Sequence, residues 1–155
     1  MEQNAGSPTE VQEVLDAGEA YLRQIRKCND DIPGEEISAK IYRIEHLVQQ
    51  IFIRVKEHPE AVSDIRKMME YYLPTTVKLL EAYAKLDAQS VQGEHITRSK
   101  REIEEVLDTL NVAFEKLLDN LFQDTAWDVA SDISVLETML AQDGLTKEDF
   151  RREPK

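Results

Sequence analysis

The stretch from Ile37 to Val55, ISAKIYRIEHLVQQIFIRV, decides the fold class of this chain. Its apolar residues recur at steps of three and four, the spacing that places side chains on one face of an α-helix. Such a face is the seam that a helix of a bundle or coiled coil presents to its neighbour. The pattern is carried by Ile37, Ile41, Ile44, Val48, Ile51 and Val55. The stretch therefore predicts a helix that packs against other helices.

The segments on either side of this helix show the same periodicity. A first helix is expected to begin near Pro8 and to end at NDDIPG, residues 29–34, because Asn, Asp, Pro and Gly together signal a loop. A third pattern follows His58 and is carried by Val62, Ile65, Met69 and Tyr72. A long fourth pattern covers 96–121, and a weaker one ends at Gly144. No alternating pattern of a strand is present. The sequence predicts an all-α, antiparallel helical bundle of four to five helices.

Pro74 interrupts the third pattern within YYLPTTVKLL, residues 71–80. Proline lacks a backbone donor, and its ring crowds the carbonyl four residues earlier. The apolar positions resume almost in phase after it, which favours a kink in one helix over a break with Pro74 in the first turn of a new helix. The hydroxyls of Thr75 and Thr76 can bond to carbonyls that a bend releases. The sequence leaves both a kinked and a broken helix open.

Composition indicates one acidic domain. The chain has 155 residues, enough for one ordinary domain, and its 31 acidic and 19 basic residues give a net charge of -12. Such a charge disfavours binding to nucleic acid and anionic lipid. No run approaches the ~20 apolar residues of a membrane helix, and the lone Cys28 fits a reducing compartment. We expect a soluble, cytoplasmic chain with a flexible segment at 1–8, a single bundle domain at 9–145 and a charged tail at 146–155.

Known catalytic motifs are missing from the sequence. Its five glycines are too dispersed for a phosphate-binding loop. Cys28 is not followed by the arginine of a cysteine phosphoryl-transfer loop. His46, His58 and His95 form neither the paired histidines of a zinc protease nor the Glu-x-x-His of a di-iron bundle. We interpret these four residues as surface or helix-end residues and expect no cofactor.

Three aspartates are the first candidates for chemistry. Asp124, Asp128 and Asp132 are spaced by four, which aligns three carboxylates on one helical face. A divalent cation could bind there, because carboxylates are the ligands that hard cations prefer. Solvated capping acids, or acids paired with lysines of another helix, explain the same spacing.

A basic segment is the second candidate. TRSKR, residues 97–101, places Arg98, Lys100 and Arg101 at the start of the long helix, where they could bind a phosphate group. The acids that follow are close enough for intrahelical pairs that would neutralise the segment. They are Glu102, Glu104, Glu105 and Asp108.

Several segments resemble the bacterial 5-bromo-4-chloroindolyl phosphate hydrolysis protein family. They are ISAKIYRIEHLVQQIFIRVKEHPE (37–60), YYLPTTVKLLEAYAKLDAQ (71–89), ITRSKREIEEVLDTLNVAFEKLLDNLFQD (96–124) and DISVLETMLAQDGL (132–145). YYLPTT is the most specific part of the resemblance, which covers roughly Ile37 to Leu145. It implies a bacterial helical protein, in many members preceded by a membrane anchor and often encoded beside toxic-anion (tellurite) resistance proteins. This sequence shows no such anchor. It is therefore expected to be either a soluble segment of a longer protein or a family member that lacks the anchor.

Two functions follow as hypotheses. The favoured one is a non-enzymatic interaction or scaffold protein of an envelope-stress or toxic-anion resistance system, which binds partner helices, a toxic-anion resistance protein or a second copy of itself. A longer native protein with an anchor would be membrane-associated. The alternative, implied by the family name, is a metal-assisted phosphate-ester hydrolase that uses the three aspartates, with Arg98 or Arg101 on the phosphate.

Four apolar residues beside the main seams would belong either to the core or to an extra surface through which the chain dimerises. They are Tyr42, Phe52, Ile53 and Tyr71.

Overall fold

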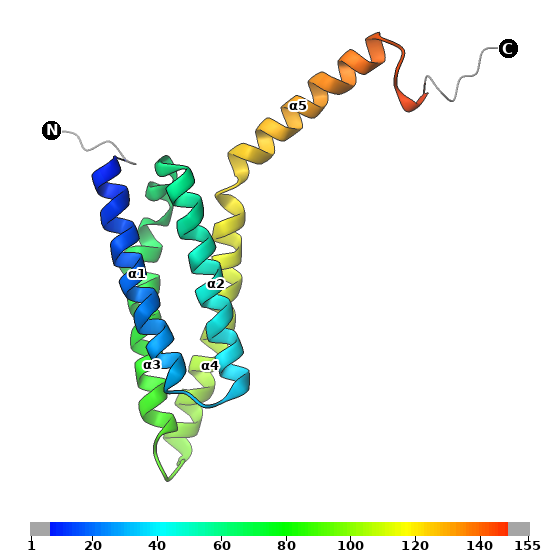
Figure 1. Ribbon diagram of the computed structural model, residues 1–155. Helices are drawn as coiled ribbons and strands as arrows, with labels where there is room; N and C mark the ends of the chain where they lie inside the picture. Colours follow the sequence, from blue (N-terminus) through cyan, green and yellow to red (C-terminus); the bar gives the residue numbers. More distant parts are fainter. Residues whose placement is uncertain (1–6, 149–155) are drawn as a thin grey trace. The chain divides into compact units, whose positions relative to one another are not determined.

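The computed structural model describes residues 7–148, and these residues contain helices and no strand (Figure 1). The elements in chain order are α1 (Pro8–Asp30), α2 (Glu35–Glu57), the 3-10 helix η1 (Pro59–Ile65), the π-helical turn η2 (Met68–Tyr72), α3 (Leu73–Asp87), α4 (Glu94–Asn120) and α5 (Gln123–Gln142). The predicted all-α class is confirmed.

The chain divides into two compact units after Leu121. The first unit contains α1 to α4, and the second, which begins at Phe122, contains α5. The sequence predicts one bundle domain over 9–145, and the boundary lies inside that range. The predicted flexible segment at 1–8 and charged tail at 146–155 fall mostly outside the described residues.

The first unit is an antiparallel four-helix bundle (Figure 1). Helix α2 packs against α1 and α4, and α3 also packs against α1 and α4, so the four helices form a closed ring around one core. Short connections join antiparallel neighbours in such bundles. Residues 88–93, for example, connect α3 to α4.

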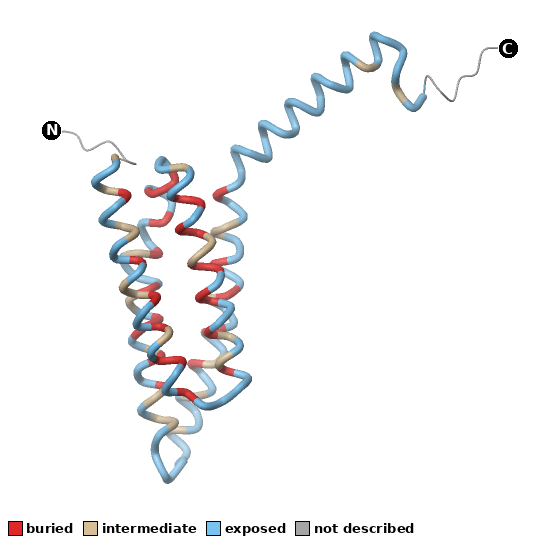
Figure 2. The backbone as a smooth tube through the Cα atoms, viewed as in Figure 1, coloured by how far each residue is buried: buried red, intermediate tan, exposed pale blue. Residues whose placement is uncertain are grey.

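The core of the bundle is built from the inward faces of its helices (Figure 2). All six seam residues predicted in α2 are buried, and α4 contributes Ile103, Leu107 and Phe114. Burying a side chain of this size stabilises the fold by roughly 1.5–3 kcal/mol. The periodicity of α2 therefore identified its buried face correctly.

Local signals in the sequence explain where α1 begins and how it is tied to α2. The Ser7 side chain accepts a hydrogen bond from the backbone N–H of Glu10 at 3.2 Å, and Pro8 occupies the first turn, where a missing donor costs nothing. At the other end, Ser38 Oγ of α2 donates to Asn29 Oδ1 at 2.7 Å. This bond lies beside the predicted loop and holds the two helix ends together.

Pro74 lies one residue inside α3, and helical backbone continues through it. The turn before it is the π-helix η2, in which the N–H of Leu73 bonds to the carbonyl of Met68, five residues earlier. This wider turn relieves the crowding between the proline ring and the preceding carbonyls. Thr76 Oγ1 donates to the carbonyl of Tyr72 at 2.6 Å, as the sequence suggested. The third helical segment therefore does not end at Pro74.

The π-helical turn also changes which residues are buried. The sequence predicts Met69 and Tyr72 on the apolar seam. The structure buries Met68 and Leu73 and packs the partly buried Met69 against the core, but it leaves Tyr72 exposed. The buried positions step by five residues across η2, since a π-helical turn holds one residue more than an α-helical turn. The prediction for Tyr72 was wrong because it assumed an uninterrupted α-helical period.

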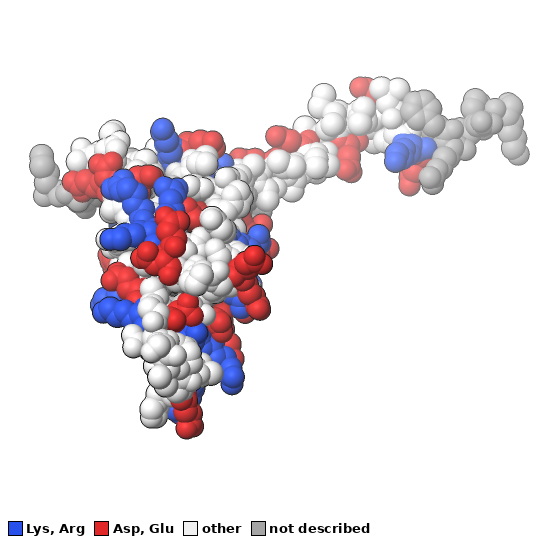
Figure 3. Space-filling model, turned by 60° about the horizontal axis from the view of Figure 1, so that its bottom comes forward, with Lys and Arg blue, Asp and Glu red and all other residues white. Residues whose placement is uncertain are grey.

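Ion pairs cross the surface between the bundle helices. Lys40 Nζ lies 3.0 Å from Asp108 Oδ2, and Arg43 lies 2.9 Å from Glu115, so both pairs join α2 to α4. Figure 3 shows acidic and basic side chains interspersed over the face of the bundle that it presents. Exposed pairs of this kind contribute at most about 1 kcal/mol each.

Candidate functional surfaces

The basic segment lies in the first two turns of α4, and the structure separates its members. Arg98 and Arg101 line an open hollow of about 400 Å³ beside Gly93 and Thr97. Lys100 contacts α3 instead: its Nζ lies 2.8 Å from Asp87 Oδ1 and 5.6 Å from the centre of the Tyr83 ring. Two of the three predicted phosphate contacts therefore share a surface, and the third joins α3 to α4.

Two of the four acids that were expected to neutralise this segment have other partners. Glu104 accepts a hydrogen bond from the Tyr83 hydroxyl at 3.0 Å, and Asp108 pairs with Lys40 of α2. Arg98 lies 2.9 Å from Nδ1 of His95, one turn earlier on α4. Between residues 7 and 148, no ion pair joins the basic segment to the acids that follow it on α4. The hollow thus keeps two exposed guanidinium groups.

The three candidate aspartates all lie on α5 and are exposed. Consecutive members are one helical turn apart, as the spacing predicts. Among the residues that the structure describes, no group of three or more His, Cys, Asp or Glu side chains is arranged to hold a metal ion. A cation at Asp124, Asp128 and Asp132 would take its other ligands from water or from another chain, and this site stays a prediction.

The two candidate groups belong to different units. Arg98 and Arg101 are at the beginning of α4, whereas Asp124 follows its end. The rise of 1.5 Å per residue places about 29 Å of helix between Arg101 and Asn120. The structure therefore does not assemble, within the first unit, the hydrolase site that the sequence suggested as an alternative.

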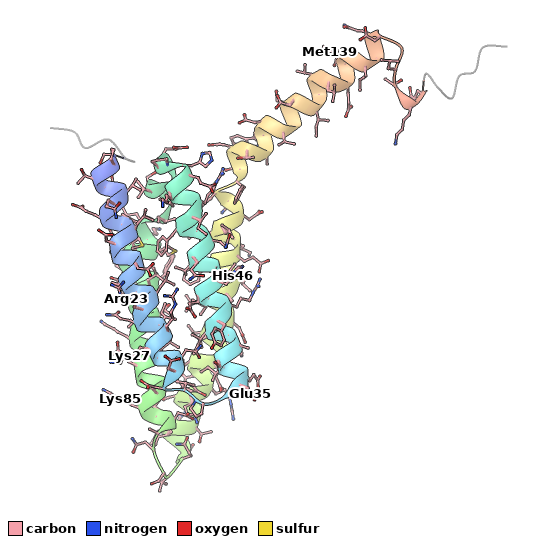
Figure 4. The ribbon with its side chains drawn as sticks, viewed as in Figure 1. Arg23, Lys27, Glu35, His46, Lys85 and Met139 are labelled. Carbon is pink, nitrogen blue, oxygen red and sulfur yellow. The ribbon has the colours of Figure 1, made fainter. Side chains whose placement is uncertain are left out.

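Helix α5, described by itself, carries an exposed apolar surface. None of its residues is buried, and Figure 2 shows it exposed along almost its whole length. Ile133 is 50% exposed and Leu136 is 55% exposed. Met139 projects from the same helix near its C-terminal end (Figure 4). We define the α5 seam as Ala126, Val129, Ile133, Leu136 and Leu140, which recur at steps of three and four.

The bundle also carries exposed apolar residues, spread over several of its elements. Tyr42, Ile53 and Tyr71 are exposed, whereas Phe52 is buried against Gly18 of α1. A hollow of about 530 Å³ lies beside η2. Its lining combines apolar side chains with charges of both signs: Ser63, Asp64, Arg66, Lys67, Met68, Glu70, Tyr71, Tyr72 and Leu117. It offers no histidine or cysteine for nucleophilic chemistry.

Two groups in the bundle have a raised pKa. Burial raises the pKa of the Cys28 thiol, with a smaller effect from the nearby carboxylate of Glu81. Burial also raises the pKa of Tyr83, assisted by its hydrogen bond to Glu104. A reactive cysteine needs a lowered pKa and access to solvent. Cys28 is buried, so its surroundings agree with the interpretation of this thiol as unreactive.

The histidines are placed as the sequence suggested. His46 and His95 are exposed on α2 and α4, and Figure 4 labels His46 on α2. His58 follows the last residue of α2 and lies 3.4 Å from Glu60. None of the three belongs to a possible metal-binding group in the described part of the chain. They are surface and helix-end residues.

Comparison with known proteins identifies the family of this chain. A family model described as 5-bromo-4-chloroindolyl phosphate hydrolysis protein matches residues 5–136. This confirms the resemblance, although the match begins before Ile37 and ends before Leu145. No curated protein and no solved structure matches the chain. Within residues 7–148, no helix is both long enough and apolar enough to cross a lipid bilayer.

Proposed function

The chain belongs to the 5-bromo-4-chloroindolyl phosphate hydrolysis protein family, and we propose that it is a non-enzymatic helical interaction protein that binds its partners through α5. The observation that carries this proposal is the α5 seam, an apolar stripe on a 20-residue helix without a buried residue. The bundle has its own complete core and does not need α5 for it. It serves as a scaffold that presents the helix.

The energetics of apolar surface support this role. Removing apolar area from water is favourable by roughly 25 cal/mol per Å², so a partner that covers the seam is stabilised by contact with it. Amphipathic helices are commonly recognised by partners through residues at this spacing. Large exposed apolar patches on folded proteins mark sites of interaction.

The cellular setting of the proposal comes from the family resemblance. It favours a bacterial protein of an envelope-stress or toxic-anion resistance system, and the lone Cys28 adds a preference for the reducing cytoplasm. A toxic-anion resistance protein is the first candidate partner.

Capture of partners by the full chain tests the proposal. We compare the wild-type chain with the double variant Ile133→Gln, Leu136→Gln, which removes apolar area from an exposed face and leaves the bundle untouched. Captured proteins are purified and tested for direct binding. We expect the double variant to bind at least roughly tenfold more weakly, as central apolar contacts do in other interfaces.

The matched control is Asp124→Asn, which changes α5 on its opposite face. It should bind as the wild type does. Equal binding by the wild type, the seam variant and the control would overturn the proposed role of α5.

The family description favours a second candidate, a metal-assisted phosphate-ester hydrolase. The purified chain would then hydrolyse 5-bromo-4-chloroindolyl phosphate with Mg²⁺, Mn²⁺ or Zn²⁺ present. Turnover that survives repurification and falls at least about 100-fold in Asp128→Asn or Arg101→Gln would replace the interaction proposal. Absence of turnover and of heat on calorimetric titration with all three ions would remove the hydrolase.

A further inference from the structure

The partner of α5 can be described further from the charges beside the seam. Resting on the proposed role of α5, we infer that this helix pairs with a basic amphipathic helix of another protein, and not with a second copy of this chain. The basis is the placement of acidic side chains on α5 beside its apolar seam.

The seam has the geometry that helix pairing requires. Its members lie at 126, 129, 133, 136 and 140, so that successive steps are three, four, three and four residues. This alternation is the heptad repeat of helices that pack along one another. The exposed fractions of Val129, Ile133 and Leu136 are 50%, 50% and 55%. The occupant of the seam is therefore another helix with apolar residues at the same spacing.

Acidic residues flank the seam on both sides. Successive residues of an α-helix are about 100° apart, which places Asp132 about 80° from the middle of the seam on one side and Glu137 about 60° from it on the other. Residues in these flanking positions set partner choice in paired helices. Asp124 lies about 160° from the middle of the seam, on the opposite face of the helix.

A second copy of this chain is a poor occupant because α5 contains no positive charge. Its four charged residues are Asp124, Asp128, Asp132 and Glu137, and it has neither lysine nor arginine. In a parallel pair of α5 helices, Asp132 of one copy faces Glu137 of the other. In either direction, only acidic or neutral side chains meet. Each copy also carries a net charge of -12, which adds long-range repulsion.

A helix with lysine or arginine beside its apolar residues fits both features of α5. Its apolar residues cover Val129, Ile133 and Leu136, while its basic side chains pair with Asp132 and Glu137. Complementary charge of this kind speeds association and selects among partners that have the same apolar pattern. The nearby Asp128 adds to the attraction at low salt, where the screening length is longest.

Two synthetic peptides of three heptads test the inference with the full chain. Both carry leucine and isoleucine on the seam, and they differ only in having lysine or glutamate at all flanking positions. Calorimetric titration should show the lysine peptide binding roughly 3- to 10-fold more tightly than the glutamate peptide. The difference should shrink at about 0.5 M salt, where charges are screened within a few ångströms.

Charge reversal supplies the variant and its control. Asp132→Lys with Glu137→Lys should reverse the preference, so that the glutamate peptide binds better. Asp124→Lys with Asp128→Lys changes the net charge equally but lies away from the seam, and it should keep the preference for lysine. Circular dichroism verifies that each variant keeps its helix content. If both double variants reversed the peptide preference, net charge alone would determine which peptide binds more tightly, and the inference would be overturned.

The remaining outcomes separate this inference from the proposed function. Equal binding of both peptides would overturn the basic partner and keep α5 as the binding element. The same conclusion would follow if the wild-type chain sediments as a dimer and the double variant Ile133→Gln, Leu136→Gln sediments as a monomer. Binding of neither peptide also overturns the inference if the capture experiment succeeds. Failure of both experiments overturns the proposed function as well.

Discussion

Gly18 of α1 is the residue against which the Phe52 ring of α2 packs. A Cβ atom at position 18 would overlap that ring, and Phe52 is itself buried. The sequence could not reveal this contact, because glycine inside a helical pattern is normally only a weak helix former. It also left Phe52 open as either a core or a surface residue. The close approach of α1 and α2 determines both the contact between Gly18 and Phe52 and the burial of Phe52.

Gly18→Ala should therefore destabilise the bundle, although alanine is the better helix former by about 1 kcal/mol. We expect a loss of roughly 1–3 kcal/mol in the free energy of unfolding, because the added methyl group displaces a buried ring. Urea denaturation measures the change. In a Phe52→Leu background the loss should shrink, since the two positions are in contact. An increase in stability in the Phe52 background would contradict the expected overlap.

Asn111 is a buried polar residue on the apolar face of α4. Its Nδ2 donates to the carbonyl of Lys40 at 3.1 Å, but its Oδ1 has no hydrogen-bond partner among the described residues. A buried acceptor without a partner costs about 1–3 kcal/mol. The sequence places an asparagine near the seam without showing whether it faces the core.

Asn111→Leu should raise the free energy of unfolding by about 0.5–2 kcal/mol, since leucine has the same branching and number of side-chain heavy atoms but no buried polar atom. Thermal unfolding followed by circular dichroism measures this change. The control Asn120→Leu alters an exposed residue at the end of α4 and should have little effect. A less stable Asn111→Leu variant would show that the bond to Lys40 outweighs the unpaired Oδ1.

At the scale of the elements, Tyr83 links α3 to α4. It is buried, its hydroxyl donates to Glu104, and the Lys100 ammonium group lies near its ring. Tyr83 belongs to the apolar pattern that resumes after Pro74. The partner on α4 could not be predicted, because it depends on how the two antiparallel helices align.

The raised pKa of Tyr83 makes stability depend on alkaline pH. An unfolded tyrosine loses its proton near pH 10, whereas the folded chain keeps the proton above that pH. Above pH 10 the unfolded state therefore binds fewer protons than the folded state. The contribution of Tyr83 to the free energy of unfolding is complete below about pH 10 and is lost as pH rises further. The loss is at most about 1.4 kcal/mol per pH unit.

Urea midpoints of the wild type and Tyr83→Phe between pH 8 and about 11 test this dependence. The wild type should lose more stability above pH 10 than the variant, because phenylalanine does not titrate. Tyr42→Phe is the control, since Tyr42 is exposed, and its profile should follow the wild type. Parallel profiles for all three proteins would contradict the role of Tyr83.

At the scale of the whole molecule, the buried apolar residues that the structure describes all lie at or before Leu121. The bundle closes with α4, and α5 contributes no buried residue. A chain that ends after Leu121 should therefore fold, with a free energy of unfolding within about 0.5 kcal/mol of that of the full chain. Urea denaturation of the two chains gives the comparison.

A shorter chain that ends after Leu110 is the control for this prediction. It lacks the buried Phe114 with the rest of residues 111–120 of α4, and it should not fold cooperatively. A loss of several kcal/mol on removal of α5 alone would show that the bundle depends on this helix.

Sequence alone determined the fold class, the buried face of α2, the approximate bounds of the helices and the family. The periodicity of apolar residues is a local property of the sequence, so it can be read without knowing which helices pack against one another. Tertiary structure decided the register across η2, the burial of Phe52 against Gly18, and the partners of Lys100 and Tyr83. A repeat of three and four residues says that one face of a helix is apolar, but only the packing of distant elements determines whether that face is covered.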